Sequence, residues 1–358
     1  MTSSSPAGLA TPPPEDSPTS FDIVSHYNRL ISSDPSITPP IAAIESLIAV
    51  LNAASLSTIT ETITLLQTSS STLLASQSNP IPLSAGTELL QRYIITSFQQ
   101  QPAQLSGHDF TQLRRQLITN SKLFVTRTKS ARSKIAKHAL PFIRDDSTIF
   151  AYGSSRVIDA ILSHAAESTR YFNVIFISSS TWSQSTADNE ATALDQSTKR
   201  LVAMGIPVAT VPFPALSHTI ASLPKAQSSN VLFLLGAEAV LENGAAVSNL
   251  GSHLVASVAK ATSIPCYFAA ESYKFTRQFP TTFGDQDLQR MDAKQEVLKF
   301  RSSSDDEKEM EWNVQGTKGG ENVGLVDITP PELISGLITE SGIVTCEGVA
   351  EELIKLWF

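Results

Sequence analysis

The chain has 358 residues, which suggests roughly two domains of about 150 residues each. Charged residues make up 17% of it, against the roughly 25% usual in soluble domains, and the formal net charge is -8. General electrostatic binding of nucleic acid needs clustered Lys and Arg, so DNA or RNA binding is the weakest function to propose.

The first third of the chain is predicted to be helical after a polar tail. Residues 1–19 are mostly Ser, Thr and Pro with little to bury, so we expect a disordered tail. From Phe21 to about Ile143, apolar residues recur at spacings of three and four, which predicts helices. Residues 20–145 are therefore predicted to form an all-helical domain. Ser- and Pro-rich breaks between its helices are expected at Ser32–Pro40, Ser69–Pro82 and Gln99–Gly107.

From Ser147 onward, short uninterrupted apolar runs alternate with helix-length segments, a pattern typical of a parallel sheet covered on both faces. The predicted strands are Thr148–Tyr152, Val174–Ile177, Val208–Val211, Val231–Leu235, Cys266–Ala270, Leu325–Ile328 and Ile343–Thr345. The predicted helices are Ser155–Ser168, Ala187–Met204, Leu250–Thr262, Pro331–Glu340 and Cys346–Trp357.

The expected fold class is α/β: an N-terminal all-helical domain followed, at 146–358, by a Rossmann-like doubly wound parallel sheet domain. A polar, acidic stretch at about 283–323 is longer than the loops of a compact domain, and we expect it to be a mobile insertion.

Polar patches follow the predicted strands, at the edge where open α/β sheets bind ligands. After the first strand, at a helix start that favours anions, come Gly153, Ser154, Ser155 and Arg156. After the fourth come Glu238, Asn243, Gly244, Gly251 and Ser252, and after the fifth come Glu271 and Lys274. A further candidate, Arg132, lies in the last helical segment of the first domain. Each patch has an ordinary alternative: a Ser helix cap, a surface carboxylate, an exposed ion pair worth at most about 1 kcal/mol, or a solvated basic helix face.

Several catalytic and metal-binding motifs are missing from the sequence. It contains no GxxxxGK[ST], no GxGxxG after the first strand, no GxSxG and no HExxH, which disfavours P-loop hydrolysis, nicotinamide dehydrogenase, nucleophile-elbow hydrolase and zinc protease chemistry. Cys266 and Cys346 match neither a zinc-ligand spacing nor a disulfide framework. The N-terminus lacks a secretion signal and no run reaches about 18 apolar residues, so we expect a cytoplasmic protein without a metal or a membrane segment.

Several segments of the chain resemble a known protein family. They are SARSKIAK at 130–137, IFAYGSSRVID at 149–159, LLGAEAVLENGAAVSNLGS at 234–252, AAESYKFTRQFP at 269–280, VDITPPELISGLITESGIVT at 326–345 and EELIKLWF at 351–358. The family contains the alpha, beta and delta regulatory subunits of eukaryotic translation initiation factor 2B, together with ribose-bisphosphate and methylthioribose-phosphate isomerases. The AESYKF block is similar to the alpha-subunit branch rather than to an isomerase.

The resemblance also implies which chemistry is missing. The family's isomerases shuttle protons with a cysteine after the first strand and an aspartate after the fourth, positions that correspond to Gly153 and Glu238. Because Gly153 has no titratable group and acid–base catalysis needs a partner in reach, we expect no isomerase activity. The isomerase Asn-Lys pair corresponds to Ser248-Asn249, which removes a phosphate-pairing charge. The candidate ligand-binding residues are still expected to hold a sugar phosphate or nucleoside monophosphate, with no cofactor required.

The resemblance implies a non-catalytic regulatory subunit of the exchange factor that reloads initiation factor 2 with GTP. We expect it to form a homodimer, to bridge the beta, gamma, delta and epsilon subunits into a decamer, and to help sense the phosphorylated alpha subunit of initiation factor 2. Candidate partner-binding residues are Thr87, Glu88 and Arg92, with helix-surface charge as the alternative. Two other functions stay open: a sugar-phosphate aldose–ketose isomerase with altered catalytic residues, and a ligand sensor whose dimer stability follows occupancy of the pocket.

Overall fold

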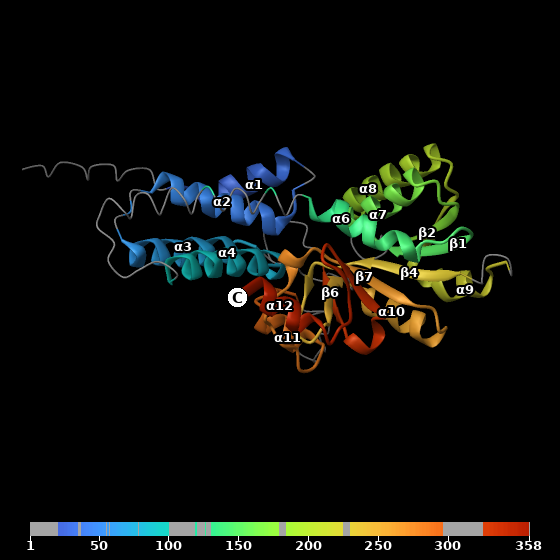
Figure 1. The fold of residues 1–358 in the computed structure, drawn as a ribbon. Helices are drawn as coiled ribbons and strands as arrows, with labels where there is room; N and C mark the ends of the chain where they lie inside the picture. The colour runs from blue at the N-terminus through green and yellow to red at the C-terminus, as the bar shows by residue number, and fades with distance from the viewer. Residues whose placement is uncertain are drawn as a thin grey trace, which may run out of the picture.

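Two parts of different architecture make up the chain (Figure 1). The computed structural model describes residues 21–34, 37–54, 56, 58–77, 79–99, 119, 126, 130–178, 184–224, 230–295 and 325–357. Four N-terminal helices lie side by side, and a mostly parallel sheet flanked by helices forms the second part. This arrangement confirms the predicted fold class. The tail expected at 1–19 lies outside the described residues.

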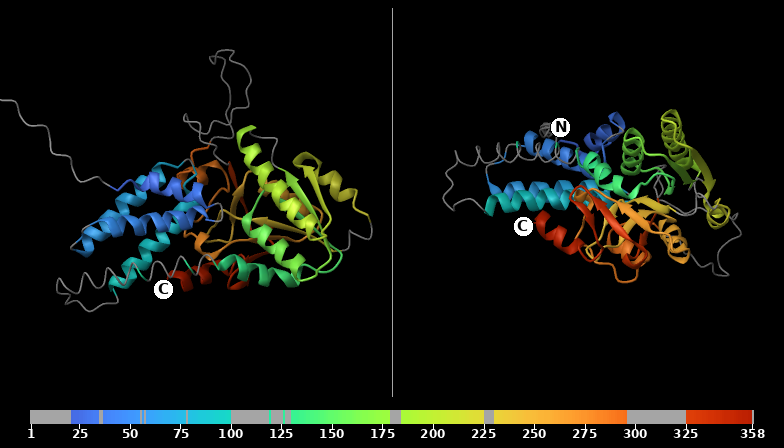
Figure 2. Two further views of the ribbon diagram at one scale, coloured as in Figure 1. Left: turned by 90° about the horizontal axis from the view of Figure 1, so that it is seen from above. Right: turned by 45° about the vertical axis from the view of Figure 1, so that its right-hand side comes forward.

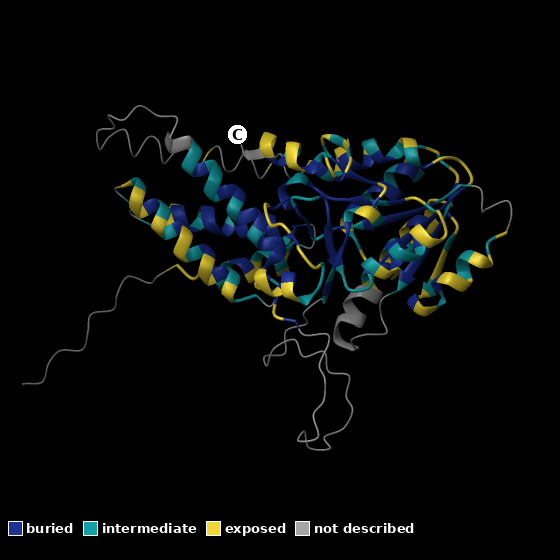
Figure 3. Cartoon of the chain, turned by 90° about the horizontal axis from the view of Figure 1, so that it is seen from below, coloured by how far each residue is buried: buried dark blue, intermediate teal, exposed yellow. Residues whose placement is uncertain are grey.

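The four N-terminal helices are α1 (Ile23–Ser33), α2 (Pro39–Ala53), α3 (Ile59–Ala75) and α4 (Ile81–Gln99), and we call them the helical layer. Asp22 caps α1 by accepting hydrogen bonds from the backbone of Val24 and Ser25. Thr58 and Glu61 form a reciprocal capping box at the start of α3. The inward faces of the helices are buried, as Figure 3 shows, and share one hydrophobic cluster that includes Ile44, Leu47, Leu66, Leu73 and Ile94.

The break expected at Ser69–Pro82 is only partly correct, because α3 continues through the Ser-rich segment to Ala75. The Thr72 hydroxyl donates to the carbonyl of Thr68 one turn earlier, so this polar side chain is satisfied within the helix. The next residue, Leu73, is completely buried in the layer's core. Tertiary packing therefore overrides the weak local preference of Ser and Thr for breaks.

The main sheet has the strand order β10-β9-β7-β4-β1-β2-β3 and is parallel except for the β9–β10 pair. Its strands are β1 (Ser147–Tyr152), β2 (Phe172–Ser178), β3 (Val208–Pro212), β4 (Val231–Gly236), β7 (Cys266–Ala269), β9 (Gly336–Thr339) and β10 (Gly342–Val344). Alternate residues of β1 enter different cores: Ile149 packs on one face of the sheet and Phe150 on the other.

Helices cover both faces of this sheet, as the views in Figures 1 and 2 show. One face carries α6 (Ala131–Ala139), α7 (Arg156–Glu167) and α8 (Gln184–Ala203). The other carries α9 (Leu216–Ala221), α10 (Ser252–Ala261) and α12 (Val349–Trp357). Because the strands are parallel, their carboxyl ends lie at one edge of the sheet. The first turns of α7 and α10 begin at this edge. Although α6 lies before residue 146, it packs against α7 and the sheet.

Two expectations for the C-terminal part are wrong. The helix predicted at Pro331–Glu340 is a single 3-10 turn, η4 (Pro331–Leu333), followed by the buried strand β9. Pro330 and Pro331 stand at the start of this turn, where proline is tolerated, and the apolar residues after it form β9 in the space between β7 and β10. The strand predicted at Leu325–Ile328 exists as β8 (Val326–Thr329), but it belongs to a separate antiparallel sheet with β5 (Ala239–Val240) and β6 (Ala246–Asn249).

The polar stretch at about 283–323 was expected to be a mobile insertion, and this expectation is wrong for its first residues, which are folded. Residues 285–290 form α11 (Asp285–Arg290), and the buried carboxylate of Asp287 accepts hydrogen bonds from the backbone of Thr281, Thr282 and Phe283. Leu288 is buried in the cluster around the small sheet. Residues 296–323 lie outside the described part of the chain.

Candidate functional site

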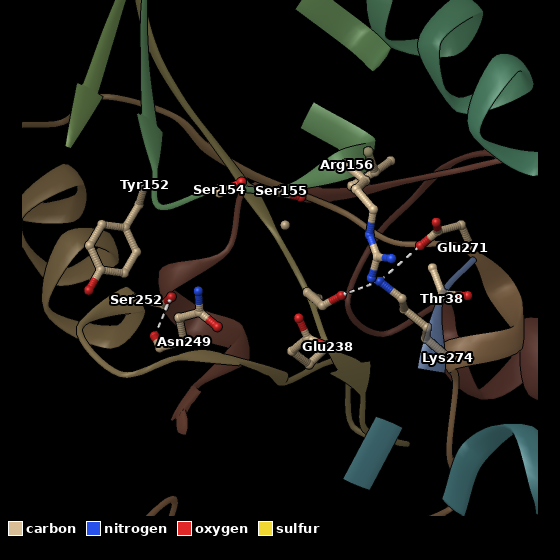
Figure 4. Close-up of a pocket in the computed structure, with 13 residues that line it drawn as sticks. Thr38, Tyr152, Ser154, Ser155, Arg156, Glu238, Asn249, Ser252, Glu271 and Lys274 are labelled. Atoms are coloured by element: carbon tan, nitrogen blue, oxygen red, sulfur yellow. Dashed lines mark hydrogen bonds and ion pairs between the residues drawn. The ribbon is translucent and has the colours of Figure 1, made fainter. Parts of the chain in front are cut away.

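A polar pocket lies at the edge of the sheet where β1, β4 and β7 end (Figure 4). Its empty volume is about 520 Å³, which includes space open to solvent. Its lining residues are Thr38, Tyr152, Ser154, Ser155, Arg156, Val157, Gly236, Ala237, Glu238, Asn249, Ser252, Glu271 and Lys274. The first turns of three helices border it, since Thr38 is the N-cap residue of α2, Arg156 begins α7 and Ser252 begins α10. Helix N-termini carry partial positive charge, so this arrangement favours an anion.

The turn from β1 into α7 forms one wall of the pocket. Gly153 adopts a left-handed conformation with φ of 63°, which a glycine accepts without strain. The turn brings the hydroxyl groups of Ser154 and Ser155 to the pocket, and the side chain of the N-cap residue Ser155 makes no hydrogen bond to the backbone N–H groups at the start of α7. Gly236 is required opposite, because a Cβ atom there would collide with the side chain of Ser155.

A buried ion cluster forms the opposite wall. The carboxylate of Glu271, with 1% of its side chain exposed, lies 3.1 Å from Nε of Arg132 and 3.0 Å from Nζ of Lys274. Lys274 also donates to the carbonyl of Ala237 at 2.8 Å. Burial alone would raise the pKa of Glu271, but the two cations outweigh it and lower this pKa to about 2. Glu271 therefore stays ionised.

The start of α10 forms the third wall. Gly251 adopts a left-handed conformation with φ of 106°, and a Cβ atom at this position would collide with the hydroxyl of Tyr152. That hydroxyl donates to the carbonyl of Leu250 at 2.5 Å. The carboxylate of Asp327 accepts hydrogen bonds from the backbone N–H of Gly251 at 2.7 Å and of His253 at 3.1 Å. Because these donors already have an acceptor, the start of α7 is the stronger anion site.

Asp327 is itself in an unusual electrostatic state. Burial raises the pKa of its carboxyl to about 7, although the hydrogen bonds from Gly251 and His253 act in the opposite direction. It supports the first turn of α10 from β8 of the small sheet, next to Ser252 of the pocket.

Most of the predicted ligand-binding residues lie together. The pocket is lined by Ser154, Ser155, Arg156, Glu238, Ser252, Glu271 and Lys274. Arg132 lies behind it, paired with Glu271, and Gly153 and Gly251 shape its backbone. Asn243 and Gly244 are elsewhere: the Asn243 side chain accepts a hydrogen bond from Ala245 in the β5–β6 turn, and Gly244 packs against Cys346.

Several lining residues are not among the candidate ligand-binding residues of the sequence analysis. Tyr152, Gly236 and Ala237 end or follow strands β1 and β4, so the same strand-end rule finds them. Asn249 ends β6, a strand that was not predicted. Thr38 comes from the start of α2, and no local signal in the sequence connects that position to the sheet edge.

The proposed partner residues on α4 differ in exposure. Thr87 is 1% exposed and its hydroxyl donates to the carbonyl of Ser84, so its assignment to a contact surface is corrected: it is part of the interior. Glu88 and Arg92 are half-buried. Burial raises the pKa of Glu88, and the charge of Arg277 opposes this shift.

Within the described ranges, no group of three or more His, Cys, Asp or Glu side chains is arranged to hold a metal ion. None of the helices in those ranges has the length and apolar character that spanning a bilayer requires.

Known proteins of similar sequence are translation factors. A sequence model of the Initiation factor 2 subunit family matches residues 32–346. The translation initiation factor eIF2B subunit alpha of Dictyostelium discoideum is 33% identical over 255 residues, covering 71% of this chain and 72% of that protein. The subunit alpha of Caenorhabditis elegans is 26% identical over 336 residues, covering 94% and 98%.

Solved structures of similar fold include the tetrameric eIF2B-beta2-delta2 complex from C. thermophilum. One of its chains matches with a TM-score of 0.68 at 19% identity, covering 93% of this chain and 94% of that one. The eIF2B beta structure from Chaetomium thermophilum matches with a TM-score of 0.65 at 17% identity, covering 95% and 93%. At these identities the likeness concerns the fold.

Replacing Glu271 by Gln should destabilise the protein strongly, because the buried ammonium of Lys274 would lose its carboxylate partner and Arg132 would lose its ion pair with Glu271. We expect a loss on the order of 3–5 kcal/mol in the free energy of unfolding, measured by urea titration. The matched control is Glu352→Gln, which breaks a pair with the exposed Lys355 and should cost at most about 1 kcal/mol. Equal losses in the two variants would contradict the role of the buried cluster.

The pKa of Asp327 predicts a pH dependence of stability. Its ordinary value is 3.8 and its folded value about 7, so between these values the folded state binds a proton that the unfolded state lacks. Stability from this group therefore falls as pH rises through that window. The difference in unfolding free energy between about pH 5 and about pH 7.5 should shrink in Asp327→Asn and persist in the exposed control Asp195→Asn. An unchanged difference in Asp327→Asn would show that its carboxyl titrates normally.

Proposed function

The chain belongs to the Initiation factor 2 subunit family, and from this premise we propose that it is an alpha-type, non-catalytic regulatory subunit of eIF2B, the exchange factor for initiation factor 2. The similarity to two proteins named eIF2B subunit alpha supports this choice within the family. Its place of action is then the cytoplasm.

The pocket has too few acid–base groups for an isomerase, and this supports a binding function. Gly153 supplies no thiol at the end of β1. Lys274 and Glu271 neutralise each other, and the Tyr152 proton is donated to Leu250. Among the described lining residues Glu238 then has no general acid or base across the pocket, and a single carboxylate does not complete a proton shuttle. This is the observation that carries the proposal.

The ligand that suits the pocket is a sugar phosphate or a nucleoside monophosphate. Its phosphate would lie at the start of α7, where Ser154, Ser155 and Arg156 supply hydroxyl donors and a guanidinium. Glu238 and Asn249 face the pocket from the neighbouring side in Figure 4, where they suit the hydroxyl groups of a sugar. The ligand is a stabilising effector in this proposal, and the protein needs no cofactor.

Assembly is the second part of the proposal. The protein would form a homodimer through its α/β part and bridge the beta, gamma, delta and epsilon subunits into a decamer that senses the phosphorylated alpha subunit of initiation factor 2. The likeness of its fold to a chain of a beta2-delta2 tetramer supports assembly with related subunits. Half-buried Glu88 and Arg92 on α4 remain candidates for the sensing surface.

Native mass spectrometry and a turnover assay test this function together. The purified chain should be a dimer, should join the other four subunits in one decameric assembly, and should not convert ribose 1,5-bisphosphate or methylthioribose 1-phosphate. Turnover of either compound at ordinary enzyme rates, about 1 per second or faster, would contradict the regulatory proposal and favour the isomerase function. A chain that stays outside the assembly would contradict the bridging role.

A further inference from the structure

One corner of the helical layer closes the pocket on the side away from the sheet. The corner is formed by the end of α1 and the start of α2, and it contributes Thr38 to the pocket lining. The carbonyl of Ile37 accepts a hydrogen bond from Nη1 of Arg156 at 2.5 Å. Tyr27 of α1 is buried close by: burial raises the pKa of its hydroxyl to about 12, and the charges of Arg156 and Glu238 both reach it. The α1–α2 corner therefore lies within the electrostatic field of the pocket.

A second connection runs through the turn after β7. This turn, η3 (Ser272–Lys274), follows Glu271, and it sends side chains in two directions. Glu271 and Lys274 line the pocket, while the ring of Tyr273 is 1% exposed and packs in the hydrophobic cluster of the helical layer. The hydroxyl oxygen of Tyr273 lies 3.2 Å from that of Thr38. Burial and the charge of Glu271 both raise the pKa of Tyr273, so its hydroxyl keeps its proton.

These two connections differ in chemistry but meet at the same corner. Arg156 carries five N–H donors in a planar fork, so it can hold an anion at the start of α7 while Nη1 stays on Ile37. Tyr273 lies between Glu271 and Lys274 in one tight turn, and both of these residues line the pocket, so a ligand that packs against this turn also restrains the phenol that contacts Thr38. A ligand in the pocket would therefore restrain residues 37 and 38 from two sides.

We propose that Arg156 and Tyr273 are positioning residues that couple occupancy of the pocket to the α1–α2 corner, so that a bound phosphate ester makes this corner of the helical layer more rigid. The coupling rests on the proposed ligand pocket, and it specifies which part of the protein responds when the pocket is occupied. Part of the binding free energy would stabilise a segment outside the sheet. This segment belongs to the helical layer, which also carries Glu88 and Arg92. A regulatory subunit would thereby transmit the presence of a metabolite to a different surface.

Hydrogen–deuterium exchange of the full-length chain tests the coupling, with ribose 5-phosphate as the probe and its binding measured by calorimetry. At saturation, exchange in peptides covering residues 37–44 should slow by about fivefold or more. Tyr273→Phe removes only the hydroxyl. It should bind the probe within about twofold of the original affinity but lose most of the slowing at equal occupancy.

The matched control is Tyr267→Phe, the same chemical change on β7 at a side chain that packs against Phe142 and does not line the pocket. It should keep the full slowing. If the probe does not bind, the ligand pocket and the coupling are both wrong. If it binds and residues 37–44 exchange as before, only the coupling is wrong. Equal slowing in Tyr273→Phe and the original chain, or equal loss in the two Phe variants, would refute the role of the Tyr273 hydroxyl.

Discussion

The ionised carboxylate of Glu271 places the strictest demand on this structure, because a buried charge is tolerated only when its partners are held in good geometry. Arg132 reaches it from α6, and Lys274 reaches it from the same turn while also binding the end of β4. Satisfying this one group therefore fixes a helix that precedes the sheet, the turn after β7 and the C-terminal edge of the central strands. The pocket is the space that this arrangement leaves open.

The same pairing decides what the pocket can do. Lys274 is held by Glu271 and Ala237, and Gly153 contributes no side chain, so the titratable groups here are fixed rather than poised for proton transfer. What remains toward the hollow is suited to recognition: the start of α7, hydroxyl groups, a guanidinium and the carboxylate of Glu238.

Sequence patterns predicted the position of the pocket better than they predicted the helices and strands around it. The strand-end rule placed Ser154, Glu238 and Lys274 at one edge, because parallel strands must end there. It failed for Asn243 and Gly244, since the chain after β4 forms a β-turn of the small sheet before it returns to the pocket. Thr38 depends on how the helical layer packs against the sheet, and the conversion of Pro331–Glu340 into β9 depends on the space beside β7. Such long-range contacts leave little trace in local periodicity.

In our proposal this pocket binds a phosphate ester through Arg156 without converting it. Calorimetric titration with ribose 5-phosphate tests it most directly, with Arg200→Ala as the control, because Arg200 pairs with Asp159 on a helix surface outside the pocket. We predict saturable binding that weakens about tenfold or more in Arg156→Ala, as loss of a charge-assisted hydrogen bond implies, and that is unchanged in Arg200→Ala. The absence of binding, or equal affinity in Arg156→Ala and the original chain, would contradict the claim.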